Sequence, residues 1–373
     1  MEPAPQPPTS VFLVPGFFGF AAIGDMRYFA HVRPALETLL SERGVDVVVH
    51  EVATRPTASL RHRVGLLAQE IATRAANRRV WVVGHSAGGI DGRLLAGAGL
   101  NLGPVQPVLE AAQAQLDAVV TLAAPHYGTP LASSFVGVSG QRALGVLSAC
   151  AVAVLRRGRL PLKASVEVLR LLRGLDMGKA LDGALLDQVL EDVLRDLPEA
   201  RRDEIARFLH DVGQSQGLLP QLMPESMDLL SMSVQTRPDV RAASVLVQAN
   251  APRLGTVLDL GFDTAGQAMH AIFTWLYRHT AATQSGSPEL PTVEGLGLDL
   301  VQPTDNDGIV PTASQVWGDV LHLAHGDHLD VLGHFAGPGL KQYDWMPSGS
   351  GYDEAQFQLL WTDVADFLVG AHH

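Results

Sequence analysis

The sequence is poor in several residue types, and each shortage excludes a class of protein. Cys150 is the only cysteine among 373 residues, so the chain can form neither an internal disulfide nor a cysteine-rich metal site. Only 18% of the residues are charged, the net charge is −12 and no basic run is present, so we expect no nucleic-acid partner. The longest apolar run, residues 143–155, has 13 residues and is too short for a transmembrane span, which takes about 20.

The amino-terminal segment lacks the features of a signal peptide. Residues 1–10 carry an early acid and four prolines, but no positively charged start and no apolar stretch. We therefore expect a cytoplasmic protein, or a secreted one from which the signal has been removed. The chain is nevertheless apolar, with 47% hydrophobic residues and a mean hydropathy of +0.14, which indicates a large core, an exposed apolar surface, or both. The final His372 and His373 are either native or the remnant of a tag.

Short β-branched runs alternate with helical patterns in the first third of the chain, and the same order returns near its end. We expect strands at 11–14, 45–52, 80–83, 118–123, 244–247 and 320–323, and helices at 33–42, 61–74, 90–95, 265–279 and 354–369. Strands that alternate with helices are typical of a parallel sheet with helices packed on it. The sequence therefore predicts an α/β fold whose mostly parallel central sheet carries helices on both faces.

Residues 79–89 carry the most informative motif of the chain. An apolar run leads into Gly84-x-Ser86-x-Gly88, and a helix-compatible segment follows. This strand–turn–helix context is typical of a nucleophile elbow, in which a sharp turn lifts a serine to the carboxyl edge of a sheet. The glycines are needed because the backbones pack too closely there for a side chain. A free serine is a weak nucleophile, so this interpretation requires a base and an orienting acid elsewhere.

The late part of the chain supplies an acid and a histidine in the required order. Asp307 lies in a loop of turn-forming residues, and His328 follows the last expected strand, 21 residues later. His328 would take the Ser86 proton and return it to the leaving group, while Asp307 would orient the imidazole and stabilise its cation.

Alternatives remain for both partners of Ser86. Asp305 lies two residues before Asp307 and can replace it as the acid if the loop geometry favours it. His325 and His334 compete with His328 for the role of base.

Two backbone N–H groups should stabilise the oxyanion of an acyl-transfer reaction. One is expected from Ala87, the residue after the nucleophile. The other is expected from Phe17, because Gly16 lets the loop after the first strand turn tightly. We also expect Phe17, Phe18 and His85 to contact the substrate.

The hydrophobic pattern of the sequence changes between residues 134 and 240, where β-strand patterns give way to amphipathic helical patterns. Apolar residues repeat every four positions over 181–193, and they take helical spacing over 205–212. The segment begins just after a strand that should end near Ser86. We therefore expect a helical cap in residues 134–240, inserted into an α/β core made of 1–133 and 241–373, although part of each apolar stripe packs on the core.

Four segments together resemble the bacterial triacylglycerol lipases of the α/β-hydrolase superfamily. They are the strand and loop of 11–19, the elbow of 84–93, the Pro-His-Tyr-Gly-Thr segment within 121–130, and the acid and histidine loops of 306–310 and 327–330, taken as a pair. The resemblance implies a serine hydrolase with Ser86 as nucleophile, Asp307 as acid and His328 as base. It also implies an oxyanion hole formed by the amides of Phe17 and Ala87.

The chain departs from this family at several points. The family usually has His-Gly where this chain has Pro15-Gly16, and its frequent disulfide is excluded here by the single cysteine. Many of these lipases bind a structural calcium through the aspartate of His-Leu-Asp and an earlier aspartate. Asp330 matches the first ligand, but residues 280–295 contain only Glu289 and Glu294 as acids, so we expect no metal.

These observations predict a lipase or esterase that cleaves esters of apolar acyl chains through an acyl-enzyme, without a cofactor. The partners expected are a small-molecule or lipid ester and, if the apolar stripes of the cap face the site, a lipid interface that the cap contacts transiently. Thioesterase, polyester hydrolase and acyltransferase activity on the same fold remain alternatives, as does a non-catalytic hydrolase-fold binding protein.

Overall fold

The structure is a computed structural model. It describes residues 8–17, 22–23, 26–55, 57–136, 143–150, 154, 160–176, 188–189, 191–192, 195, 217–253, 255–256, 260–281, 289–335, 344 and 346–370. Phe18, most of the expected apolar stripe at 181–193, the whole stripe at 205–212, and His372 and His373 lie outside these residues.

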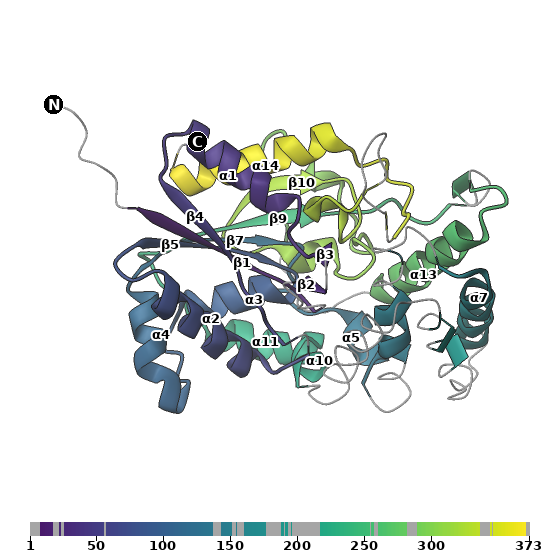
Figure 1. The fold of residues 1–373 in the computed structure, drawn as a ribbon, viewed down its shortest axis with the longest axis horizontal. Coiled ribbons are helices and arrows are strands. Elements are labelled where there is room, and N and C mark those ends of the chain that lie inside the picture. The colour runs from purple at the N-terminus through teal and green to yellow at the C-terminus, as the bar shows by residue number, and fades with distance from the viewer. Residues whose placement is uncertain are drawn as a thin grey trace.

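Six parallel strands form one sheet through the centre of the molecule (Figure 1). From edge to edge they are β10 (Asp319–Ala324), β9 (Arg241–Val247), β7 (Leu116–Leu122), β5 (Arg79–His85), β1 (Thr9–Val14) and β4 (Val47–Glu51). Every neighbouring pair is parallel. Strands covered on both faces are buried along their length and rich in apolar residues, and β1 and β5 have this character. The expected strands are therefore confirmed, with ends that differ by one to three residues.

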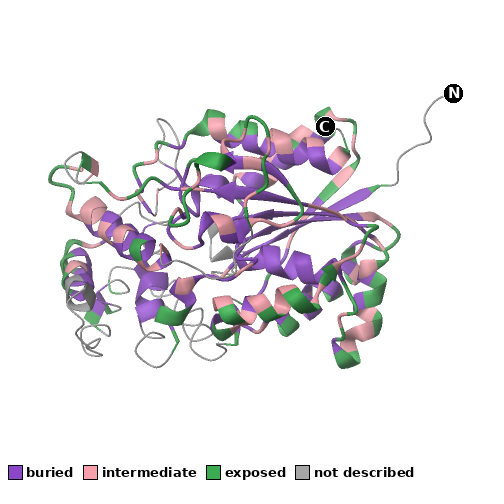
Figure 2. Cartoon of the chain, turned by 180° about the vertical axis from the view of Figure 1, so that it is seen from behind, coloured by how far each residue is buried: buried purple, intermediate pink, exposed green. Residues whose placement is uncertain are grey.

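Helices cover both faces of the sheet, as expected. On one face lie α1 (Val32–Glu42) and α14 (Glu354–Val369), and on the other lie α2 (Leu60–Arg74), α3 (Ala87–Leu95) and α4 (Gln106–Gln113) (Figure 1). The side chains of a strand alternate between faces, so Val11 and Leu13 of β1 pack in one buried cluster, while Phe12 and Val14 pack in the other. Figure 2 shows the sheet as a continuous buried layer between these helices.

The helix ends follow from local sequence. Asp353 begins α14 with a capping box, in which its carboxylate accepts from Gln356 N–H and the Gln356 side chain accepts from Asp353 N–H. Gly370 ends the same helix in the left-handed conformation that glycine adopts without steric cost. Ser59 caps α2 by accepting from the backbone of His62.

Further helices gather beyond the carboxyl ends of the strands (Figure 1). They are α5 (Pro130–Ser134), a helical stretch at 143–150, α7 (Leu162–Asp176), α10 (Leu218–Gln221) and α13 (Thr264–Thr280), with α7 packed on α13. Helix α11 (Pro224–Ser233) lies beside α3, where Ser231 Oγ accepts from Arg93. Most of this layer belongs to residues 134–240, the segment for which the sequence predicts a cap.

Two small antiparallel pairs and four short 3-10 turns complete the described structure. The pairs are β2 (Ala22–Ile23) with β3 (Met26–Arg27), and β6 (Gly97–Ala98) with β8 (Gln235–Thr236). The turns are η1 (Gly103–Val105), η2 (Leu298–Leu300), η3 (Thr312–Gln315) and η4 (Asp330–Leu332). Among the helices described, none has both the length and the apolarity needed to span a bilayer.

Candidate active site

Ser86 lies on a strained turn between the central strand β5 and helix α3. Its φ of 55° and ψ of −128° fall in a region that side-chain-bearing residues rarely adopt. The surroundings hold it there, because a Cβ at position 84 would come within 2.3 Å of Gly88 O, and one at position 88 within 2.1 Å of Val14 O. The elbow geometry expected from the motif is therefore present, and both glycines are required by close backbone approach.

The loop after β1 approaches the same serine. A Cβ at Gly16 would lie 2.6 Å from Ser86 Cβ, so only glycine fits there. Phe17, the next residue, lines the pocket in front of Ser86. Ala87 is the first residue of α3, so its N–H has no acceptor within the helix. The two amides expected to form an oxyanion hole thus come from loops that meet at Ser86.

His328 and Asp307 are joined by a buried hydrogen bond. His328 Nδ1 lies 2.7 Å from Asp307 Oδ2, and the two side chains are 4% and 0% exposed. The same loops are also joined through the backbone, since His328 N–H donates to Asp307 O at 3.0 Å. This contact engages Nδ1, so Nε2 is the ring nitrogen left for the pocket that His328 lines.

The Asp307 carboxylate is fixed from several directions. Its Oδ1 accepts from the backbone N–H groups of Ile309 and Val310, at 2.8 and 2.7 Å. Its Oδ2 accepts from the Gln315 side chain at 3.2 Å, in addition to its contact with His328. Gln315 is buried and also bonds the end of β9, so the acid loop is tied to the sheet. An acid held in this way orients an imidazole well.

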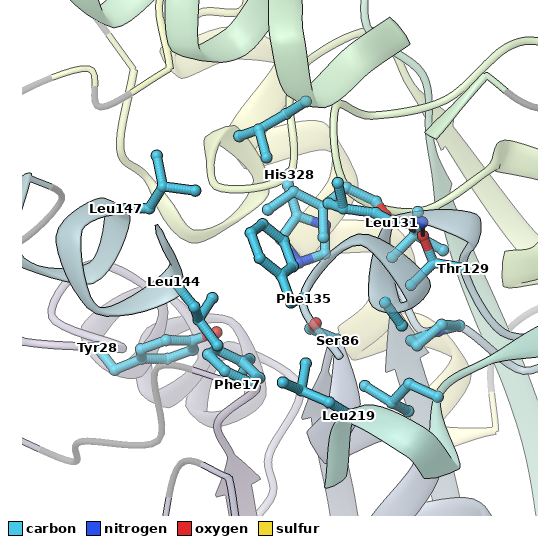
Figure 3. Close-up of a pocket in the computed structure, with 16 residues that line it drawn as sticks. Phe17, Tyr28, Ser86, Thr129, Leu131, Phe135, Leu144, Leu147, Leu219 and His328 are labelled. Atoms are coloured by element: carbon cyan, nitrogen blue, oxygen red, sulfur yellow. Dashed lines mark hydrogen bonds between the residues drawn. The ribbon is translucent and has the colours of Figure 1, made fainter. Parts of the chain in front are cut away.

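Ser86 and His328 line one pocket of about 710 Å³, open solvent at its mouth included (Figure 3). Its other lining residues are mostly apolar: Phe17, Tyr28, Pro125, Thr129, Leu131, Ala132, Phe135, Leu144, Leu147, Leu219, Leu222, Leu276, Ile309 and Val310. The Thr129 hydroxyl is already engaged, because it donates to Ile309 O at 2.6 Å. The pocket therefore has a mostly apolar wall, to which Ser86 and His328 both contribute.

The alternative acid and bases lie elsewhere. Asp305 accepts from the Gln248 side chain and from Gln302 N–H. His325 is exposed, and His334 is buried against His31. Burial and the neighbouring His31 lower the pKa of His334 to about 4. Only Asp307 and His328, of the candidates weighed, are brought together.

His85, which the sequence analysis expects to contact the substrate, is not among the residues that line the pocket. His85 is 0% exposed and does not line the pocket, since strand alternation turns its side chain to the face that holds Trp81 and Val83. Its Nδ1 lies 2.7 Å from Tyr28 Oη, and its Nε2 lies 2.8 Å from His328 O. Burial lowers its pKa well below the usual range, and His328 adds to this shift.

Sequence reasoning missed the buried pair of Arg63 and Asp91, whose side chains are both fully buried. The Arg63 guanidinium forks onto the Asp91 carboxylate, with the shortest contact at 2.7 Å. It also donates to Thr54 Oγ1 and, at 2.8 Å, to Pro15 O. Because Pro15 directly precedes Gly16, this pair helps to hold the loop that approaches Ser86. No motif in the sequence marks Arg63 as the partner of a helix residue 28 positions away.

Three aspartates form a second charged cluster behind the histidine loop. One oxygen each from Asp327, Asp330 and Asp344 lies within 4.8 Å of the others. Burial raises the pKa of each, the neighbouring carboxylates add to this for Asp327 and Asp330, and the pKa of Asp344 reaches about 7. Asp327 Oδ2 and Asp344 Oδ1 are buried without a hydrogen-bond partner among the described residues.

This cluster fits a hard cation such as calcium, which prefers several carboxylate oxygens. The sequence matched Asp330 to a calcium ligand of the resembled family but found no earlier aspartate to complete it. In the structure, Asp327 and Asp344 each place a carboxylate oxygen within 4.8 Å of one from Asp330. Both lie outside residues 280–295, where the second ligand was sought, and the expectation of no metal stays a prediction.

No protein-family model matches this sequence, and no curated protein matches it either. Among solved structures, the chain is similar to lipase 1 from Pelosinus fermentans, with 15% identity over 97% of this chain and 99% of that one at a TM-score of 0.54. It is also similar to EstA from Clostridium botulinum, with 16% identity over 99% of this chain and 91% of that one at a TM-score of 0.53. A metagenomic carboxyl esterase is similar with 17% identity over 99% of this chain and 79% of that one, at a TM-score of 0.51. At these identities the likeness shows the fold, which is the α/β-hydrolase fold.

Proposed function

We propose that this protein is a serine carboxylic ester hydrolase that acts on esters of apolar acyl chains. The observation that carries the proposal is the convergence of three segments at one pocket. Ser86 on its strained turn and His328, bonded to Asp307, line the same apolar cavity although they come from opposite ends of the chain. The fold is shared with proteins described as lipases and esterases, which supports this reading over a binding module.

The reaction begins when Ser86 Oγ attacks the carbonyl carbon of the ester and His328 Nε2 takes the hydroxyl proton. The amides of Ala87 and Phe17 stabilise the negative charge on the carbonyl oxygen. The tetrahedral intermediate then releases the alcohol, which receives the proton from His328, and the acyl group stays on Ser86. A water attacks this acyl-enzyme with the same histidine as base, which frees the acid and restores the serine.

Asp307 keeps the His328 imidazole in one tautomer during both halves of the cycle. Its carboxylate accepts from Nδ1–H, so Nε2 is unprotonated and able to act as base. When His328 becomes cationic, the buried carboxylate lies 2.7 Å from the charge and stabilises it.

The pocket supports a preference for an apolar acyl group. Residues from many separate parts of the chain form its wall, including Phe135, which follows α5, and Leu144 and Leu147 of the helical stretch at 143–150. Burying an apolar chain there is favourable by about 0.8 kcal/mol for each CH₂. We expect kcat/KM to rise with acyl length until the cavity is filled.

We also propose that residues 134–240 form a cap over the site. Leu144, Leu147, Leu219 and Leu222 of this segment line the pocket, which supports the idea that it covers bound substrate. Exposed apolar side chains on the same segment, Leu162 of α7 and Met232 of α11 among them, support transient contact with a lipid interface.

The three aspartates behind the histidine loop would hold a divalent cation that stabilises this loop. Asp330 lies two residues after His328, so a cation there would tie the loop to Asp344, 14 residues farther along the chain. A cation at this place supplies charge compensation, and the steps at Ser86 proceed without it.

The first test is hydrolysis of p-nitrophenyl esters from short to long acyl chains, with labelling of Ser86 by a fluorophosphonate probe. Ser86→Ala should remove both activity and labelling. Asp307→Asn should lower kcat by about 10⁴-fold, because the amide leaves the imidazole in the wrong tautomer. Asp305→Asn is the matched control and should stay close to wild type. Activity that survives in Ser86→Ala, or a folded protein whose Ser86 stays unlabelled, contradicts the proposal.

A further inference from the structure

A chain of three hydrogen bonds runs behind Ser86, between the loop after β1 and the histidine loop. Gly16 N–H donates to Tyr28 Oη at 3.2 Å, Tyr28 Oη lies 2.7 Å from His85 Nδ1, and His85 Nε2 lies 2.8 Å from His328 O. All three contacts are buried. This series of hydrogen bonds thus joins the backbone next to Phe17 to the backbone of His328.

The direction of each bond follows from its two ends. His328 O can only accept, so His85 Nε2 must carry the proton that it donates. A neutral imidazole then has no proton on Nδ1, which must accept from the Tyr28 hydroxyl. Tyr28 Oη in turn has a lone pair for the Gly16 N–H, which can only donate. Every donor and acceptor in this chain is used in one consistent way.

We propose that Tyr28 and His85 are positioning residues. They hold the loop after β1, which carries Phe17, and the catalytic histidine, His328, at a fixed separation around Ser86. This effect on rate rests on the ester-hydrolase function proposed above. Phe17 and His328 act on opposite sides of the reacting carbonyl, and a displacement of about 1 Å between such groups can cost about 10²-fold in rate. The chain spans that distance with two side chains held in the core.

The bond directions given above require a neutral His85. A proton on Nδ1 would have to donate to Tyr28 Oη, and the Tyr28 hydroxyl would then have to turn its own proton to another acceptor. Burial lowers the pKa of His85 well below its usual range, as does His328, whose ring centroid lies 4.6 Å away. Burial also raises the pKa of Tyr28, so its hydroxyl keeps the proton that it donates. His85 therefore stays neutral beside an imidazole that becomes charged in each cycle.

The tautomer of His85 is the direct test. Nitrogen-15 spectra of histidine-labelled protein, assigned through a His85 variant, should show a neutral ring protonated at Nε2 at about pH 6.5, where an ordinary histidine is half charged. A ring that is protonated at Nδ1, or that is charged at this pH, overturns the proposal. This readout needs no catalytic activity, so it separates a failure of the hydrogen-bond chain from a failure of the ester-hydrolase function.

Kinetics of Tyr28→Phe test the consequence. We expect kcat to fall by about 10- to 100-fold with KM within about twofold of wild type, because loop placement suffers while the apolar wall is kept. Tyr352→Phe is the matched control, since the Tyr352 hydroxyl is buried without a partner among the described residues. Equal kcat in both variants contradicts the proposal.

A pair of variants at position 85 separates positioning from packing. His85→Gln can still donate an N–H toward His328 O, whereas His85→Leu cannot. We expect His85→Gln to recover part of the kcat that His85→Leu loses, with both proteins checked for folding by circular dichroism. Equal loss in two folded variants would show that His85 only fills space.

Discussion

Two buried charged clusters flank the site, and they solve the same physical problem differently. The Arg63–Asp91 pair contacts the loop after β1 through Pro15 O. Each charge of the pair has an opposite partner, and the guanidinium also donates to backbone and side-chain oxygens. The aspartate cluster of Asp327, Asp330 and Asp344 lies behind the histidine loop. Burial raises the pKa of all three carboxyls, and the neighbouring carboxylates add to this for Asp327 and Asp330. Two of the carboxylate oxygens have no partner among the described residues.

The difference shows what a buried charge needs. Desolvation costs several kcal/mol for each ion, and only an opposite charge with good hydrogen bonds offsets it. The Arg63–Asp91 pair carries that compensation within the chain. The aspartate cluster must take up either protons or a cation. We therefore expect the first cluster to respond to mutation, and the second to respond to metal and pH.

The largest expected effect is from Arg63→Met. It leaves Asp91 buried without its partner and should lower the free energy of unfolding by about 3–5 kcal/mol. Urea denaturation measures this loss. The double variant with Asp91→Leu should recover a large part of it, because no buried charge remains. If the double variant is as unstable as the single one, the pair is not the reason for the loss.

Removal of divalent cations comes second. If the aspartate cluster binds calcium, calcium at 100 times its Kd should stabilise the fold by about 2.7 kcal/mol, and a chelator should reverse this. Thermal unfolding with and without calcium measures the shift, and isothermal titration measures binding. Asp344→Asn should abolish both responses, whereas Arg63→Met should keep them. A wild-type protein whose thermal unfolding does not change with calcium, and which binds none, would contradict the cation proposal.

The pH dependence of the metal-free protein tests the same cluster without a cation. A carboxyl whose pKa is higher in the folded chain stabilises the fold below its unfolded pKa and loses this contribution as pH rises. The pKa of the Asp344 carboxyl rises from 3.8 to about 7 on folding, so stability is lost between about pH 4 and pH 7. Asp344→Asn should therefore gain stability relative to wild type as pH rises through this window. A difference that is constant with pH would contradict the raised pKa.

The smallest effect is expected at a surface pair used as reference. Arg43 and Asp366 lie 2.6 Å apart, with side chains 20% and 35% exposed, so water screens much of their attraction. Asp366→Asn should cost no more than about 1 kcal/mol in the same urea experiment. A loss as large as that of Arg63→Met would mean that burial is not what sets the two pairs apart.

The fold was predictable because its signals are local. Each strand of the sheet is a short β-branched run, and helix α14 was expected at 354–369, which matches its observed bounds. The strained turn at Ser86 followed from two glycines at fixed spacing. Asp307 and His328 followed from their order along the chain, and the structure brings them together.

What the sequence did not reveal depends on distant contacts. Tyr28 bonds a residue 57 positions away, and Asp344 reaches the histidine loop across a stretch without any motif. His85 is a different case, because the two-residue period of a strand already places it on the face of Trp81 and Val83. There the motif drew attention to the neighbour of Ser86, and the simpler rule of alternation was overlooked.

The position of β10 at one edge of the sheet bears on how the protein is made. When β1 to β9 have left the ribosome, five of the six parallel strands and Ser86 have been made, but neither Asp307 nor His328. Until β10 emerges, β9 offers an apolar open edge to any extended segment nearby. The nascent chain is thus prone to mispairing at this edge while the segment between β9 and β10 is made, and we expect its yield in cells to depend on chaperones that shield the edge.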